Sequence, residues 1–227
     1  MKLRFNPFSS SSSEPMPTLP PIYCITLPEE PWKGRLAERH FVELGITARF
    51  VHGIQGVTIG LKPTNPYDYV DDGSPRYLHP ASVGCILSHR LALTVAITDG
   101  AQEFIIVEDD VEFIPGFAQR WPEWRAALPE DADVVQLEYC CHEDKPTEPH
   151  ESAPVARCFY PFCAACIWWR RDAAIEALAL LRPIDRSYDI MLIQRVFPFL
   201  SHYIALPQLA SQRSNHTWPS SIDNAPK

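Results

Sequence analysis

The sequence predicts an α/β fold, in which a single domain holds a mostly parallel, Rossmann-like β-sheet flanked by helices. Short apolar runs typical of strands alternate along the chain with segments of helical spacing. The first strand, helix and strand follow one another within about 30 residues, which requires a crossover connection and therefore parallel strands. The chain of 227 residues is 46% hydrophobic, so it can bury one large core.

The N-terminal part supplies the strand–helix–strand unit. We expect a strand at residues 22–27, a helix at 34–46 and a second strand at 48–54. Gly45 lies where that helix would end. Residues 57–80 are rich in Pro, Asn and Asp and predict a long loop.

A second helix and strand follow this loop. The helix covers residues 82–100, with Ser82 as its N-cap and Asp99-Gly100 at its end. The strand at residues 103–110 begins with an apolar run and ends in three consecutive carboxylates. The acidic end of an otherwise core-like strand is the feature that most needs explaining.

The C-terminal part continues the alternation. We expect strands at residues 132–139, 163–169 and 203–210, and a helix at 171–181. A polar, proline-containing loop covers residues 142–154. With the earlier elements, these complete a two-sided α/β sheet.

The folded domain is expected at residues 22–215. Residues 1–21 contain five consecutive serines and four prolines after them, which predicts a disordered tail. Residues 216–227 are expected to form a C-terminal tail.

Charge and hydropathy exclude some function classes. The formal net charge of −8 argues against a protein built to grip nucleic-acid backbones or anionic lipid. No run approaches 18 apolar residues, so we expect no membrane-spanning helix, although peripheral membrane contact stays open through Phe5 and Phe8. Lys2 and Arg4 are not followed by an apolar segment of signal-peptide length, so we expect a cytoplasmic protein with reduced cysteines.

The three carboxylates are Glu108, Asp109 and Asp110. In an open α/β sheet, ligands bind beyond the carboxyl ends of the strands. In an extended chain Glu108 and Asp110 share one face, with Asp109 on the other. Such carboxylates raise each other's pKa unless a cation compensates, and Mg²⁺ or Mn²⁺ commonly binds one or two carboxylates together with phosphates. The spacing permits a metal–diphosphate site or, equally, a solvated strand end.

Residues 82–113 resemble the central signature of glycosyltransferase family 25, which includes bacterial lipooligosaccharide galactosyltransferases and collagen galactosyltransferases. The family pattern places Gly-Cys and Ser-His around the start of a helix, followed by a strand that ends in Glu-Asp-Asp. Similar segments extend the resemblance over residues 22–215. The matching positions are Gly84-Cys85, Ser88-His89, Glu108-Asp109-Asp110, Arg35, Asp189, Pro207 and Gln212.

The resemblance implies a GT-A-type fold that binds a UDP-hexose, with galactose or glucose as the sugar. It implies that Mn²⁺ or Mg²⁺ bridges the donor diphosphate at the acidic motif, where we assign Glu108 and Asp110 to the metal. The cation would stabilise the charge of the leaving nucleotide. The donor-side candidates are Arg35, Ser88, His89 and Asp109. Without the resemblance, His89 would be interpreted as a packed histidine and Arg35 as a surface arginine.

The family inverts the anomeric centre, so a base should deprotonate an acceptor hydroxyl, expected to be a sugar of a surface glycan. Asp189 is the first candidate for this base and Glu138 the second. Each has the alternative of a helix cap or an ion-pair partner.

The chain departs from the family pattern at several positions. The departures at Gln55 and Ser82 bear on the donor side and leave the sugar open more than the reaction class. They also keep open a non-catalytic binding module on a degenerate transferase scaffold. The full set of departures is Thr26, Gln55, Ser82, Cys166 and Trp169.

Zinc binding is a further alternative. Cys163 and Cys166 have the short spacing of a zinc pair, and Cys140, Cys141 and His142 offer more ligands. Against it, Cys163 and Cys166 lie in an apolar stretch, and strand residues three apart point to opposite faces.

Two other reactions are also considered. A transferase that modifies nucleic-acid bases stays open: the net charge argues against it, but five arginines could line a basic groove. A two-carboxylate hydrolase needs acids on both sides of its substrate, and three adjacent acids on one strand do not provide that. The arginines are Arg120, Arg125, Arg170, Arg171 and Arg213.

Overall fold

The computed structural model describes residues 18–57, 68–69, 75–76, 78–141 and 147–213. Most of the expected N-terminal tail, the C-terminal tail and most of the long loop after the second strand lie outside the described residues. The same holds for His142.

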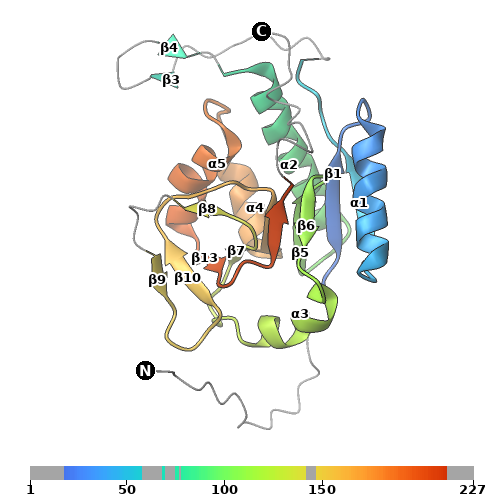
Figure 1. The fold of residues 1–227 in the computed structure, drawn as a ribbon. Coiled ribbons are helices and arrows are strands. Elements are labelled where there is room, and N and C mark those ends of the chain that lie inside the picture. Colours follow the sequence, from blue (N-terminus) through green and yellow to red (C-terminus); the bar gives the residue numbers. More distant parts are fainter. Residues whose placement is uncertain (1–17, 58–67, 70–74, 77, 142–146, 214–227) are drawn as a thin grey trace.

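The centre of the fold is an eight-stranded mixed sheet (Figure 1). Its strands, in spatial order, are β2 (Ala48–His52), β1 (Ile22–Thr26), β5 (Glu103–Glu108), β12 (Cys166–Arg170), β7 (Val134–Gln136), β13 (His202–Ala205), β10 (Val155–Cys158) and β9 (Thr147–Pro149). Parallel pairs join β1 to β2 and β5, and β13 to β7, whereas β12 and β10 run antiparallel to their neighbours. All the other strands point one way, so the predicted α/β fold with a mostly parallel sheet is confirmed.

Helices cover both faces of this sheet (Figure 1). On one face, α2 (Pro80–Thr98), α4 (Arg171–Leu180) and α5 (Tyr188–Met191) pack over a core that includes Phe104 and Trp169. On the other face, α1 (Pro31–Glu43) and α3 (Phe117–Ala126) pack over a core that includes Ile105 and Trp168. Neighbouring residues of one strand enter opposite cores because side chains alternate across a sheet.

Shorter elements complete the fold. Three two-stranded pairs lie outside the main sheet, and a π-helix and a 3₁₀-helix follow α5. The pairs are β14 (Ala210–Gln212) with β6 (Val111–Phe113), β11 (Pro161–Phe162) with β8 (Cys140–Cys141), and β3 (Asp68–Tyr69) with β4 (Pro75–Arg76); the helices are Leu192–Val196 and Phe197–Phe199.

Helix α2 starts two residues before the predicted position. Its N-cap is His79, whose Nδ1 accepts from the backbone N–H of Ala81 at 3.2 Å, and not Ser82. Pro80 suits the first helical position because its missing N–H needs no partner there. By length and apolar composition α2 meets the criterion for a membrane-spanning helix, contrary to the expectation, although it packs on α4, β1 and β5 within the core.

Several other boundaries differ from the prediction for local reasons. The first helix begins at Pro31, and strand β12 begins only at Cys166 because Cys163 has a φ of 65°, which is incompatible with a strand. The last expected strand divides into β13 and β14. Helix α3 was not predicted because Pro122 resembles a helix breaker, but buried tryptophans on both sides of it anchor the helix.

Candidate active site

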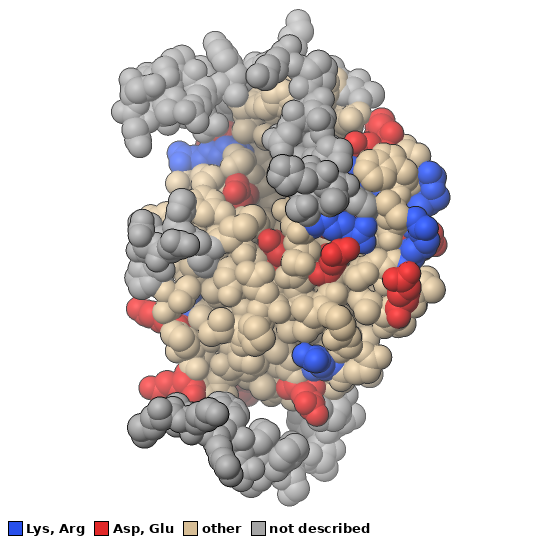
Figure 2. All heavy atoms as spheres, viewed as in Figure 1, with Lys and Arg blue, Asp and Glu red and all other residues tan. Residues whose placement is uncertain are grey.

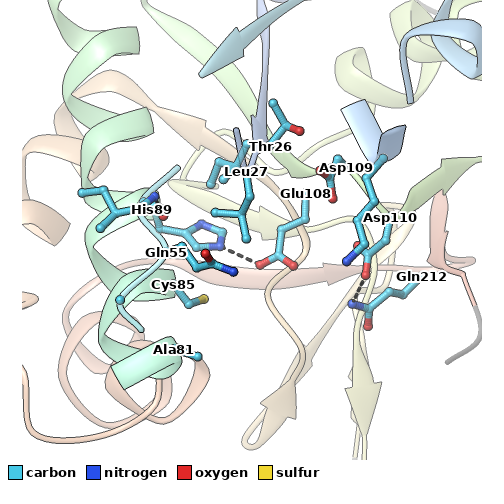
Figure 3. A pocket seen from close by; sticks show the side chains of 15 residues that line it. Thr26, Leu27, Gln55, Ala81, Cys85, His89, Glu108, Asp109, Asp110 and Gln212 are labelled. Atoms are coloured by element: carbon cyan, nitrogen blue, oxygen red, sulfur yellow. Dashed lines mark hydrogen bonds and ion pairs between the residues drawn. The ribbon is translucent and has the colours of Figure 1, made fainter. Parts of the chain in front are cut away.

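A cavity of about 170 Å³ opens at the carboxyl ends of β1 and β5 (Figure 3). The loop after β2, the start of α2 and the end of β14 complete its wall. We call it the first cavity. It is lined by Ile25, Thr26, Leu27, Lys33, Ile54, Gln55, Gly56, Ala81, Cys85, Ser88, His89, Glu108, Asp109, Asp110 and Gln212.

A second cavity of about 330 Å³ adjoins the first. Cys85, Glu108 and Gln212 line both cavities, so the two are neighbours, and we call the two cavities together the cleft. The second cavity is otherwise lined by Ser82, Cys163, Ala164, Ala165, Ser187, Tyr188 and Asp189.

The three predicted carboxylates all line the first cavity (Figure 3). Strand β5 ends at Glu108, and Asp109 and Asp110 form a turn, so the alternation expected from an extended chain does not reach Asp110. Glu108 Oε1 lies 2.9 Å from His89 Nε2, and Asp110 Oδ2 accepts from Gln212 Nε2 at 2.8 Å. The turn therefore directs the carboxylates to different partners around one opening.

The acidic cluster has the electrostatics of a cation site. Burial raises the pKa of Asp110 to about 7, and the charge of Glu108 contributes to the rise. Burial also raises the pKa of Asp109 to about 6, against the opposing charge of Lys33. Within the described part of the chain, the buried Oδ1 of Asp110 has no hydrogen-bond partner. An unpartnered carboxylate oxygen beside a second carboxylate fits Mg²⁺ or Mn²⁺, which bind through oxygen ligands.

His89 is held rigidly beneath the acidic motif. Its side chain is 2% exposed, and its ring stacks on Tyr188 with centroids 4.0 Å apart. The bond to Glu108 then fixes the position of that carboxylate. His89 thus connects α2, β5 and α5 at the boundary between the two cavities.

Ser88 attaches the loop after β2 to α2. Its hydroxyl accepts from the backbone N–H of Ile54 at 2.7 Å and donates to the carbonyl of Gly84 at 2.7 Å. A Cβ at Gly84 would lie 2.3 Å from the carbonyl oxygen of Ile54, so glycine is what allows this close approach. The result is that the loop presents Gln55 to the first cavity.

Of the remaining predicted residues, Asp189 lines the cleft and Arg35 does not. Asp189 lines the second cavity in the first turn of α5, where its Oδ1 accepts from Ser187 Oγ at 2.6 Å and from the N–H of Ile190 at 2.8 Å. Arg35 is exposed in a separate hollow that shares only Thr26 and Leu27 with the first cavity.

Glu138 lies in a bend just after β7 and lines neither of the two cavities. Its side chain is 4% exposed, and burial, followed by the charges of Glu108 and Asp110, raises its pKa to about 7. The structure thus groups the acidic motif with Ser88 and His89, places Asp189 across the cleft, and leaves Arg35 and Glu138 outside its lining.

Two residues that line the site were not among the predicted site residues, although Gln212 was one of the positions of the family resemblance. Lys33 is a 3% exposed lysine that lines the first cavity and pairs with Glu30 at 2.9 Å. Gln212 donates a hydrogen bond to Asp110, although the two residues are 102 positions apart in the sequence. The pairing of β14 with β6 brings Gln212 close to Asp110, and no local sequence pattern predicts that pairing.

The cysteine pair considered as a zinc alternative, Cys163 and Cys166, does not form a group of possible metal ligands in the described part of the chain. Cys166 is fully buried within β12, whereas the sulfur of Cys163 lies 2.8 Å from that of Cys140. The described contacts of the scattered arginines are intramolecular: Arg125 pairs with Glu103, and Arg171 donates to the carbonyl of Ile97. On the face drawn in Figure 2, the acidic and basic side chains of the described residues are dispersed, and they form no single large basic patch there.

Comparisons with known proteins agree with this architecture. The family model of glycosyltransferase family 25, described as an LPS biosynthesis protein, matches residues 19–155, more than half of the chain. A curated Bos taurus protein, "Probable inactive glycosyltransferase 25 family member 3", is 24% identical over 190 residues, which are 76% of this chain and 32% of that protein. A Drosophila melanogaster "Glycosyltransferase 25 family member" is 28% identical over 106 residues, 43% of this chain and 17% of that protein.

This chain therefore spans about a third or less of the length of these curated relatives. Among solved structures, a glycosyltransferase involved in the glycosylation of the major capsid of PBCV-1 matches with a TM-score of 0.51 and 13% identity. The match covers 91% of this chain and 96% of that one. At this identity the likeness shows the fold alone.

Proposed function

The chain belongs to glycosyltransferase family 25, and from that premise we propose that it transfers galactose or glucose from a UDP-sugar to a hydroxyl of a glycan. The observation that carries the proposal is the cleft of two neighbouring cavities. Acidic side chains of β5 and the following turn lie in its first cavity, and Asp189 lines its second cavity. In the proposed reaction a diphosphate would bind in the first cavity and the attacking hydroxyl would lie near Asp189, on the other side of the sugar.

The first cavity is the proposed site of the donor diphosphate. Glu108 and Asp110 would hold Mn²⁺ or Mg²⁺, which when bound supplies positive charge that stabilises the leaving UDP. His89 keeps Glu108 in place, Gln212 keeps Asp110 in place, and Lys33 adds a positive charge to the same wall. Ser88 acts as a positioning residue because backbone groups engage its hydroxyl.

Asp189 is the proposed base of an inverting transfer. Its carboxylate takes the proton of the acceptor hydroxyl, whose oxygen forms a bond to the anomeric carbon while the bond to the diphosphate breaks and UDP leaves with the electron pair. Two hydrogen bonds to Oδ1 orient the carboxylate. Glu138 is less well placed because it does not line the second cavity.

The proposal is tested by screening nucleotide sugars with and without Mn²⁺, with melting temperature and release of the nucleoside diphosphate as readouts. A ligand that binds only the folded state raises the melting temperature. We expect UDP-galactose or UDP-glucose to stabilise the protein only with the metal. The Asp110→Ala variant should stay folded and lose this response, and undiminished turnover in that variant would overturn the assignment.

A non-catalytic binding module is the second candidate. The name of the bovine relative and the engagement of Glu108 by His89 favour it. Both candidates bind a nucleotide sugar, but only the enzyme releases UDP from it. Metal-dependent UDP release, even slow and without acceptor, would exclude the binding module.

A further inference from the structure

We propose that Glu138, Cys140 and Cys163 form a second metal site, distinct from the carboxylates after β5, and that this site takes Zn²⁺. One carboxylate oxygen and the two sulfur atoms all lie within 4.8 Å of one another. The side chains come from the bend after β7, from β8 and from the end of β11. Glu138 and Cys140 are close in the sequence, whereas Cys163 follows Cys140 by 23 positions and is brought to them by the fold.

Strand pairing builds the site. In the β8–β11 pair Cys140 lies opposite Phe162, which places Cys163 next to it. Cys163 has a φ of 65°, a left-handed conformation that costs a non-glycine residue about 1 kcal/mol or more. The surrounding structure maintains it, because Gln136 Nε2 donates to the Cys163 carbonyl at 2.5 Å and Gln136 is itself held by His202 at 3.0 Å.

Charge is the argument for a cation. Glu138 is 4% exposed, and in the described part of the chain its Oε2 has no hydrogen-bond partner. The neighbouring charges that act on it, those of Glu108 and Asp110, are negative, and a backbone hydrogen bond with Ala165 opposes their effect. A buried carboxylate with one oxygen left unpaired is costly, and a bound cation next to it removes that cost.

The ligand set selects the metal. Thiolates bind Zn²⁺ in preference to Mg²⁺ or Mn²⁺, and two thiolates with one carboxylate leave a fourth position of a tetrahedral site open. A disulfide between Cys140 and Cys163 would explain why their two sulfur atoms lie close together. It would still leave the buried Oε2 of Glu138 without a partner. The three groups together therefore favour metal over a disulfide.

The site has a consequence for the cleft. Cys163 lines the second cavity, so the metal would anchor the wall that faces Asp189. It would also engage the oxygen of Glu138, which leaves Asp189 as the base. This last consequence rests on the proposed function, whereas the metal site itself does not.

The experiment measures zinc per chain in the full-length protein purified with a reductant and without chelators. We expect one zinc in the wild type, and its loss in Cys140→Ser, Cys163→Ser and Glu138→Gln. Cys166→Ala is the matched control, because Cys166 is fully buried within β12 and is not one of the three grouped ligands, and it should retain the metal. Asp110→Asn should also retain zinc, which separates this site from the carboxylates of the first cavity.

Cobalt substitution of the wild type gives a second readout, which remains informative even where a variant fails to fold. Two thiolate ligands produce thiolate-to-cobalt charge-transfer absorption, which should be roughly halved in each cysteine variant that remains folded by circular dichroism. The proposal is overturned by absence of stoichiometric zinc and of the cobalt band in the reduced wild type. Zinc that persists in all three ligand variants would overturn it too, as would a Cys140–Cys163 disulfide in metal-free protein purified with the reductant.

Discussion

The two cavities of the cleft are built from different kinds of structure. The acidic side of the first cavity comes from the end of a central strand and from one long helix, α2, whose buried His89 fixes Glu108. The second cavity shares residues of α2, β5 and β14 with the first, and its remaining wall comes mainly from a turn before β12 and from α5, a helix of four residues. The comparison suggests that the first cavity is a rigid, preorganised site for phosphate and metal. The second is assembled from segments that the rest of the fold brings together.

The largest expected effect is in the second cavity. Asp189→Asn removes the proposed base but keeps the shape of the side chain, so kcat should fall about 10²–10⁴-fold. Binding of the UDP-sugar with Mn²⁺ should be unchanged, because Asp189 does not line the first cavity. Steady-state kinetics together with calorimetry check both statements. Near-normal kcat would remove Asp189 from the mechanism.

The first cavity is tested by Asp110→Asn. The variant keeps an acceptor for Gln212 but loses a negative charge, so we expect it to fold and to lose Mn²⁺-dependent donor binding. Turnover should fall about 100-fold, corresponding to about 3 kcal/mol of lost stabilisation of the leaving group. The readouts are UDP release and calorimetry with Mn²⁺. A drop in kcat with intact donor binding would assign Asp110 to the chemical step instead of the metal.

Rigidity of the first cavity is tested by Ser88→Ala. Loss of the hydroxyl leaves the N–H of Ile54 without this partner, which should lower the free energy of unfolding by about 1–3 kcal/mol. The same change in Thr94, an exposed residue of α2 whose hydroxyl also donates to a helix carbonyl, is the matched control and should cost less than about 0.5 kcal/mol. Urea denaturation measures both, and equal costs would argue against the role of Ser88.

The smallest effect is a pH dependence of the metal-free protein. The pKa of Asp110 is raised from 3.8 to about 7, so its contribution to stability is present below pH 4 and is lost as pH rises through about 7. Asp110→Asn does not titrate, so the melting temperature of the wild type should fall relative to that of the variant over this range. Added Mn²⁺ at pH 7.5 should reverse the difference. A wild type that gains relative stability with rising pH would contradict the assignment.

The contrast between the cavities also explains which features could be predicted from the sequence and which could not. Helix α2 and strand β5 are continuous segments with regular spacing, so the α/β class and the position of Glu108 followed from local pattern. The turn at Asp109 and Asp110 was not predicted because a strand pattern alone does not show where the extended chain ends.

Other features depend on pairing between distant segments. The antiparallel direction of β12 and the approach of Gln212 to Asp110 are set by partners far along the chain. Lys33 was overlooked because a buried lysine in a helix resembles a surface one in sequence. The meeting of Cys140 with Cys163 follows from the β8–β11 pairing, which the sequence pattern did not indicate.

The most direct test of the account is calorimetric titration of UDP into the wild type with and without Mn²⁺, repeated with Asp110→Asn and Asp189→Asn. The account predicts binding by the wild type only when Mn²⁺ is present, loss of that binding in Asp110→Asn, and unchanged binding in Asp189→Asn. Metal-independent binding of UDP by the wild type, or equal binding by Asp110→Asn, would contradict a metal–diphosphate site at the end of β5.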